Sequence, residues 1–244
     1  MSAPIALIVG AGDYIGAAIA RRFAAGGFTV CLARRNGDKL APLVDEITSA
    51  GGTAHGYSLD ARDEDQITTL FKRIEDEIGP LDLVVFNVGG NVRFPIRETT
   101  SRVFRKVWEM ACFAGFLTGR EAAHHMVPRG RGAVFFTGAT ASVKGSAGFS
   151  AFAAGKHGLR ALAQSMAREL GPKGIHVAHL VIDAGVDTAF VRERIAQAGG
   201  DPDALPPDSL MNPASIAETY WQLYHQTPDA WTFEIDLRPY GETW

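Results

Sequence analysis

Three glycines directly after an apolar run near the N-terminus, Gly10, Gly12 and Gly16, give the clearest chemical signal in the sequence. Gly10 can take a tight turn, Gly12 leaves room for a diphosphate, and Gly16 lets the following helix pack closely. The first amides of that helix would offer N–H groups to an anion. We therefore expect the loop Gly10-Ala11-Gly12-Asp13-Tyr14-Ile15-Gly16, with Asp13, Tyr14 and Ile15 included, to bind a dinucleotide.

The next apolar run ends in Ala33-Arg34-Arg35, where an acidic residue would bind the 2′-hydroxyl of NAD. Two guanidinium groups suit a 2′-phosphate instead, so Arg34 and Arg35 favour NADP over NAD. The alternative is that both arginines are solvated charges on a loop.

The elements that position these residues follow from the spacing of apolar side chains. Short apolar runs that read as strands alternate with segments of helical periodicity. The expected strands are residues 5–9, 28–33, 54–59, 81–87, 133–137, 175–182 and 231–237. The expected helices lie around residues 17–24, 40–47, 64–78, 102–126 and 151–170, with one more beginning at Asn212-Pro213. This alternation predicts an α/β fold, a Rossmann-like doubly wound parallel sheet in a three-layer α/β/α arrangement, with residues 1–244 as one domain.

Composition excludes several classes of function. The 244 residues carry a formal net charge of −3 with no basic stripe, so nucleic acid is not an expected partner. Two cysteines are too few for a disulfide framework, and no metal ligand set stands out. No segment is long and apolar enough for a membrane span and no leader precedes the first strand, so we expect a cytoplasmic protein.

The stretch from about residue 184 to 213 is expected to cover a substrate. Its last part, 198–213, contains Gly-Gly, Asp-Pro and Pro-Pro steps and is interpreted as a mobile loop. Its apolar side chains allow an apolar ligand or simple packing: Phe190, Ile195, Leu205, Leu210 and Met211. The identity of the substrate stays open.

Motifs along nearly the whole chain occur at the spacing of a known family. They are Gly10 and Gly16, Asp60, Asn87-Val88-Gly89-Gly90, Phe152-Ala153-Ala154-Gly155-Lys156, Gly174 to Val177, and Thr188. Together they resemble the short-chain dehydrogenase/reductase family. The resemblance implies that Asp60, with the adjoining Ala61, contacts adenine, and that Thr188 meets the nicotinamide amide. It also implies that Asn87, Val88 and Gly89 line the ribose path and that Lys156 binds ribose hydroxyls.

The departures from the family pattern fall on its catalytic Ser-Tyr-Lys-Asn set. Phe152 stands at the tyrosine position, Ala139 at the serine position and Ala111 at the asparagine position, so only Lys156 is kept. A phenyl ring has no proton to exchange, and positioned proton transfer is worth about 10²- to 10⁴-fold in rate. Carbonyl reduction by the family route is therefore compromised.

Other residues near these positions are candidates for the missing roles. Thr140 and Ser142 are possible binders of a substrate oxygen, although a turn role explains both. Asp183 and Ala184 stand where the family has Pro-Gly. Asp183 is therefore a titratable residue that the family lacks at the carboxyl end of this strand, although a capping or solvated acid is the simpler interpretation. Tyr14 replaces the middle glycine of the family's loop.

Three functions remain in competition. The first is an NADP-dependent oxidoreductase with altered acid-base residues. The second is a catalytically inactive NADP(H)-binding sensor or partner subunit. The third is a non-redox lyase or isomerase built in the same cleft.

The resemblance also implies assembly as a homodimer or homotetramer through two long helices and the last strand. The tail offers large side chains that suit a neighbour's pocket or the chain's own core. These are Trp231, Phe233, Ile235, Leu237, Tyr240 and Trp244.

Overall fold

A seven-stranded parallel sheet forms the centre of the computed structural model, which describes residues 3–242. The strand order is β3-β2-β1-β4-β5-β6-β7. The strands are β1 (Ile5–Val9), β2 (Thr29–Arg34), β3 (Thr53–Ser58), β4 (Leu81–Phe86), β5 (Gly132–Thr137), β6 (Ile175–Ile182) and β7 (Glu234–Leu237). The central strands are apolar and buried because helices cover both faces, as parallel sheets require.

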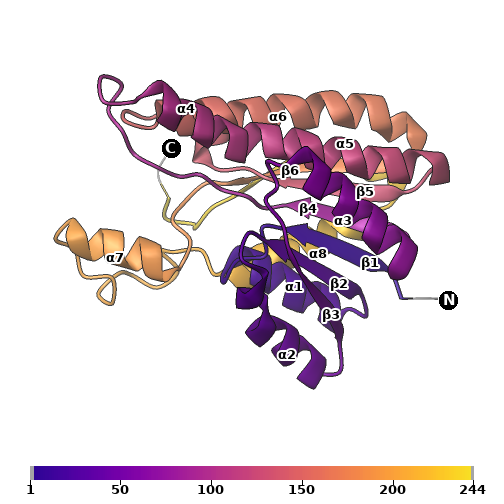
Figure 1. Ribbon diagram of the computed structural model, residues 1–244. Coiled ribbons are helices and arrows are strands. Elements are labelled where there is room, and N and C mark those ends of the chain that lie inside the picture. Colours follow the sequence, from indigo (N-terminus) through magenta and orange to yellow (C-terminus); the bar gives the residue numbers. More distant parts are fainter. Residues whose placement is uncertain (1–2, 243–244) are drawn as a thin grey trace.

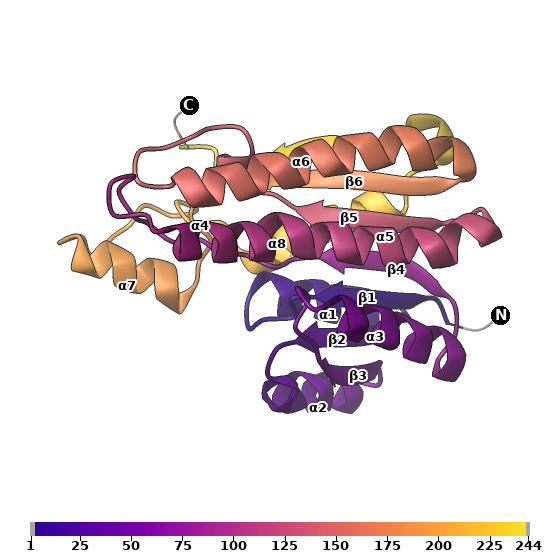
Figure 2. The same cartoon turned by 45° about the horizontal axis from the view of Figure 1, so that its top comes forward.

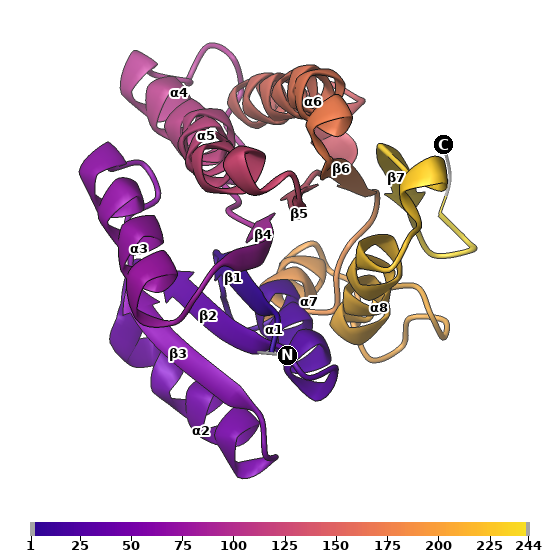
Figure 3. The ribbon, with the colours of Figure 1, turned by 90° about the vertical axis from the view of Figure 1, so that its right-hand side faces the viewer.

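The helices form one layer on each face of the sheet, except for one that projects from the body of the molecule (Figures 1 and 3). They are α1 (Ile15–Ala25), α2 (Ala41–Ser49), α3 (Glu64–Glu77), α4 (Ser101–Trp108), α5 (Ala114–Met126), α6 (Ser150–Leu170), α7 (Ala189–Gln197) and α8 (Pro213–Tyr224). Apolar side chains of α3, α5 and α6 make one core with the sheet, and those of α1, α2 and α8 make the other. The predicted three-layer, doubly wound α/β fold is confirmed.

The long helix predicted over residues 102–126 is interrupted. Between α4 and α5 the segment Glu109–Phe113 is a π-helical turn, which carries one residue more per turn than an α-helix. Within this turn Ala111 is fully buried, and a Cβ placed on Gly155 of α6 would lie 2.9 Å from its methyl group. Close packing of the turn on α6 depends on these two small residues, which lie far apart in sequence.

The region expected to cover the substrate contains a helix that periodicity did not indicate. Helix α7 buries none of its residues and projects from the body of the molecule (Figures 1 and 2). A bridge between Val186 and Met211 closes the base of this projection. Residues 198–212 contain turns and bends without a further helix or strand, in agreement with the irregular loop expected there.

The C-terminal tail packs largely on its own chain. Phe233 joins one core, Ile235 and Leu237 join the other, and Trp231 stacks on His176 at a centroid distance of 4.9 Å. Tyr240 is exposed, and the predicted role of Trp244 lies outside the described residues. Among residues 3–242, no helix has the length and apolar character to cross a bilayer.

Candidate active site

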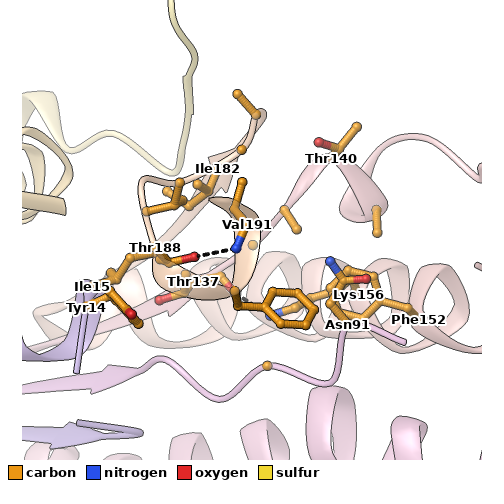
Figure 4. Close-up of a pocket in the computed structure, with 18 of the residues that line it drawn as sticks. Tyr14, Ile15, Asn91, Thr137, Thr140, Phe152, Lys156, Ile182, Thr188 and Val191 are labelled. Atoms are coloured by element: carbon orange, nitrogen blue, oxygen red, sulfur yellow. Dashed lines mark hydrogen bonds between the residues drawn. The ribbon is translucent and has the colours of Figure 1, made fainter. Parts of the chain in front are cut away.

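A cavity of about 820 Å³ opens along the carboxyl ends of β1, β4, β5 and β6, where α/β sheets bind ligands. It extends from the glycine loop past α6 to α7 (Figure 4). A second cavity of about 520 Å³ lies beside β2 and shares Gly10, Gly12 and the segment 87–89 with the first. The two cavities meet at the glycine loop, as an elongated ligand would require.

The three glycines of the loop have separate structural reasons. Gly10 has a φ of +91°, and a Cβ there would lie 2.6 Å from the backbone oxygen of Asn87. A Cβ on Gly16 would lie 2.5 Å from the oxygen of Gly10, so α1 packs directly on the loop. A Cβ on Gly12 would meet nothing within 4 Å, because it would project into open space. The loop therefore fits a diphosphate that approaches the backbone at Gly12.

Asn87 holds the end of β4 against this loop. Its side-chain amide donates a hydrogen bond to the oxygen of Gly10 at 3.1 Å, and its backbone N–H donates to Val9 at 2.8 Å. Val88 and Gly89 follow it along both cavities, as the expected ribose path requires.

The second cavity contains the residues expected near adenine and the 2′-phosphate. Arg34 and Arg35 both line it, and Arg34 forms an ion pair with Asp13 at 2.8 Å. Arg35 is exposed and has no ion pair with any residue in 3–242. Lys39, which sequence reasoning missed, adds a third cation to this wall.

Asp60 and Ala61 also line the second cavity, but the carboxylate of Asp60 is already engaged. The guanidinium of Arg62 donates to it, with Nε 2.9 Å from Oδ1. These hydrogen bonds hold the pKa of Asp60 below its ordinary value. Arg62 therefore stands beside the expected adenine contact, and the sequence pattern gave no sign of this pairing.

Tyr14 connects the glycine loop with α7. Its hydroxyl accepts a hydrogen bond from the backbone N–H of Ala189 at 2.9 Å. The neighbouring Thr188 caps α7 by accepting from the N–H of Val191 at 3.1 Å, and Thr188, Tyr14 and Ile15 lie together at one end of the cavity (Figure 4).

Lys156 is a buried residue of α6, and its side chain lines the cavity. Nζ donates to the oxygen of Thr137 at 2.7 Å and to that of Val88 at 3.4 Å. Burial lowers the pKa of this side chain to about 8, because the charged form loses its hydration. The ring centroid of Phe152 lies 6.0 Å from Nζ, so an apolar surface adjoins the cation (Figure 4).

Of the other residues predicted at catalytic positions, some line the cavity and others do not. Ala139 and Thr140 line it. Ser142 does not: it is fully buried, and its hydroxyl accepts a hydrogen bond from the N–H of Ala139 at 3.1 Å. This position does not favour a role for Ser142 as a substrate binder, and the hydrogen bond fits the turn interpretation.

Asp183 and Ala111 are also absent from the residues that line the cavity. The carboxylate of Asp183 forms an ion pair with Arg238 at 3.0 Å, so its suggested role as an acid in the cavity is not supported by its position. Ala111 lies in the core beneath Gly155.

Comparison with known proteins gives the family of this fold and site. Residues 4–199 match the family model described as short chain dehydrogenase. The chain belongs to the short-chain dehydrogenase/reductase family.

Members of the family that are similar to this chain are found among solved structures and named proteins. A short-chain dehydrogenase from Rhodopseudomonas palustris is 54% identical, with a TM-score of 0.83 over 97% of this chain and 99% of that chain. A metagenomic short-chain oxidoreductase in complex with NADP is 25% identical, with a TM-score of 0.84 over 98% of each chain. The 1-deoxy-11-beta-hydroxypentalenate dehydrogenase of Streptomyces exfoliatus is 32% identical over 80% of this chain and 73% of its own length.

Several residues that line the cavity were not expected from the sequence. Asn91 follows Gly89-Gly90 after β4 and lines the same cavity as Phe152 and Lys156 (Figure 4). Lys144 and Arg194 also line the cavity. Asn91 could have been predicted from the sequence, because it is a polar residue just beyond a family motif. The positions of Lys144 and Arg194 at the cavity depend on the tertiary fold of their segments, which the sequence pattern does not indicate.

A buried polar network lies next to the family lysine. His179 of β6 is fully buried, and its Nδ1 lies 3.0 Å from Oε2 of Glu234 on β7. Arg160 of α6 donates both Nε and Nη2 to the same carboxylate, at 2.6 and 2.7 Å. Burial lowers the pKa of His179 to about 4, so the imidazole is neutral at pH 7. The network fixes the helical turn that follows Lys156 against the edge of the sheet.

Proposed function

We propose that this protein binds NADP(H) and interconverts a hydroxyl and a carbonyl group. The observation that carries the proposal is one continuous cavity that begins at the open space beside Gly12 and reaches the ammonium of Lys156. The complex of a metagenomic relative with NADP supports the choice of cofactor. The Streptomyces relative is named as a dehydrogenase of a hydroxylated compound, which supports the reaction type.

The preference for NADP over NAD rests on the cations of the second cavity. Arg35 and Lys39 are available to a 2′-phosphate, and Arg34 is oriented beside them by Asp13. No acidic side chain at the end of β2 offers hydrogen bonds to a 2′-hydroxyl. Titration calorimetry with NADPH and NADH should therefore show that NADPH binds at least about tenfold more tightly. A difference of this size corresponds to one additional charge-assisted hydrogen bond to the 2′-phosphate.

In the proposed reaction the proton is supplied by Lys156, because Phe152 stands where the family has tyrosine. When bound, NADPH supplies a hydride for the carbonyl carbon. The ammonium of Lys156 gives one proton to the carbonyl oxygen, which completes the alcohol, and the resulting amine regains a proton from water. The hydrogen bonds from Nζ to Thr137 and Val88 hold the donor in place.

Absorbance of NADPH in the presence of a panel of ketones and aldehydes tests this function. We expect cofactor oxidation with at least one compound, and a reduction rate that falls as the pH rises through about 8, where Lys156 loses its proton. Lys156→Met should abolish this pH dependence together with turnover. No oxidation with any carbonyl compound would contradict the proposal.

The second candidate is a cofactor-binding protein without turnover, acting as a sensor or partner subunit. The observation that favours it is Phe152, whose ring lies at the cavity wall in place of an ionisable hydroxyl. This candidate predicts NADPH binding by calorimetry together with complete absence of turnover over the same panel.

We also propose that the protein forms a homodimer or homotetramer. Large aromatic side chains are exposed along α4 and α5, at Phe104, Trp108 and Phe116, and such surfaces mark association sites. Light scattering should give a mass of at least two chains, and Trp108→Asp should shift it towards one chain. A monomer at micromolar concentration would contradict this proposal.

A further inference from the structure

The charge lining the cavity differs at its two ends. Among its described lining residues the only acidic side chain is Asp13, at the nucleotide end, and Asp13 is already paired with Arg34. The rest of its described lining contains three cations, Lys144, Lys156 and Arg194, and no acidic side chain. A ligand in this part of the cavity therefore meets positive charge without any compensating carboxylate.

Lys144 and Arg194 come from separate segments of the chain. Lys144 follows the 3-10 turn Thr140–Ser142, and Arg194 lies on α7. Neither forms an ion pair with a described side chain. Arg192, also on α7, shows the contrast, since it pairs with Asp187 at 2.6 Å and with Asp203 at 2.9 Å.

The cavity that these cations line also contains three phenylalanine side chains. Phe149 and Phe152 line it from the start of α6, and Phe190 lines it from α7. The guanidinium of Arg194 lies 5.7 Å from the ring centroid of Phe190, so its charge stands at the edge of this apolar surface. Exposed Lys and Arg side chains beside an apolar wall suit a ligand that has an apolar body and an anionic end.

We propose that the substrate is an apolar carboxylic acid, whose body lies against Phe149, Phe152 and Phe190 and whose carboxylate binds to Lys144 and Arg194. This inference rests on the proposed function, because it concerns the same site. The reacting hydroxyl or carbonyl lies at the Lys156 end of the substrate, and the carboxylate lies at the solvent end of the cavity.

Calorimetry with ligands that do not react tests the inference without turnover. The probes are cyclohexanecarboxylate, the larger 1-adamantanecarboxylate, their methyl esters and cyclohexyl phosphate, each titrated into the protein with saturating NADP⁺ and without it. We expect each acid to bind at least about tenfold more tightly than its ester, since the ester keeps the body and loses the charge. Added salt should weaken the binding of the acids but not that of the esters.

Single substitutions test which cations bind the carboxylate of the acids. Lys144→Gln and Arg194→Gln should each weaken binding of the acids about fivefold or more and leave the esters unchanged. Lys72→Gln removes an exposed cation on α3, remote from the cavity, and should change neither affinity. Melting temperatures of the three variants should match that of the parent protein, because all three side chains are exposed.

Several outcomes would overturn the inference. These are equal affinities for acid and ester, no effect of either cavity variant, no binding of any acid, or tighter binding of the phosphate than of the acids. Failure of the proposed function can be distinguished from failure of this inference.

If NADPH binds and reduces a neutral ketone while the acids bind no more tightly than their esters, the proposed function stands and the substrate class is wrong. If NADP⁺ does not bind while the acids still do, the function is wrong and the anion site stands.

Discussion

The glycine loop and α7 line the same cavity, yet they are held in place by different means. At Gly10 and Gly16 backbone atoms approach so closely that a single Cβ would lie 2.5 to 2.6 Å from an oxygen. Helix α7 has no buried residue and is joined to the body by the Val186–Met211 bridge and a few polar contacts. The nucleotide end is thus defined by backbone geometry, whereas the substrate end depends on individual side chains. Substitutions at the two ends should therefore separate binding from chemistry.

The largest effect is expected from restoring hydroxyls at the chemical end. Phe152→Tyr together with Ala139→Ser places both groups on the cavity wall and should raise the NADPH-dependent reduction rate by about 10²- to 10⁴-fold, with unchanged NADPH affinity. Phe149→Tyr is the matched control, because it adds a phenol to the same wall at another position. A double variant that folds, binds NADPH and gains no activity would contradict this view.

Ala111→Asn is best left out of that variant. Ala111 is fully buried and packs on Gly155, so a larger amide side chain would overpack the π turn, at a cost of about 1–3 kcal/mol. Adding it should lower the melting temperature without a further gain in rate.

At the nucleotide end a pair of glycine substitutions separates binding from folding. Gly12→Ala should leave the melting temperature unchanged and weaken NADPH binding roughly tenfold or more, because its methyl group projects into the open space. Gly16→Ala should lower the free energy of unfolding by about 1–3 kcal/mol, because the oxygen of Gly10 stands where its methyl group must go. Equal melting temperatures for the two variants would contradict the difference that we infer between these glycines.

Lys156 should connect stability with pH. Its pKa is about 8 in the folded protein against an ordinary 10.5, so the cost of burying its charge is present in full below pH 8 and is relieved as the pH rises towards 10.5. Compared with Lys156→Met, the parent protein should therefore gain stability across this window, by at most about 1.4 kcal/mol per pH unit. Urea unfolding of both proteins at pH 7 and pH 9.5 measures the difference. If the difference in unfolding free energy between the two proteins did not change with pH, Lys156 would not be desolvated in the folded state.

The smallest effect is expected where the two ends meet. Tyr14→Phe removes the acceptor for the N–H of Ala189, a hydrogen bond worth about 0.5–1.5 kcal/mol. Hydrogen exchange at Ala189 should become faster, while the melting temperature changes little. Tyr240→Phe, at an exposed position, is the control and should leave exchange at Ala189 unchanged. Unchanged exchange in Tyr14→Phe would mean that the start of α7 is held by other contacts.

The sequence predicted the parts of this fold that depend on local patterns. Strands such as β6 and the glycine loop were located because apolar runs and glycine spacing act over a few residues. The break at Glu109–Phe113 was missed because it depends on Gly155 in another helix. Helix α7 was missed because it has no buried face to impose a periodic pattern.

The candidate site shows the same limit. The positions of Gly12, Asn87 and Lys156 on the cavity wall follow from motifs, and the structure brings them together. The roles suggested for Ser142 and Asp183 were not supported, because Ser142 accepts a hydrogen bond from Ala139 within its own turn and Asp183 pairs with the distant Arg238. Lys144 and Arg194 were missed because single cations in loops and exposed helices carry no spacing signal.

The π-helical turn between α4 and α5 has a consequence for changes in chain length. Because it accommodates one surplus residue, deleting a single position from Glu109–Phe113 would merge the two helices into one continuous α-helix. Five residues in a π turn rotate the chain about as far as four residues in an α-helix, so the two flanking helices would keep nearly the same orientation about their axis. The face that carries Phe104 and Trp108 would therefore stay aligned with Phe116. Loss of one amino acid from this turn should therefore be far less damaging than loss of one from within α5, where each residue is needed to keep the α-helical register.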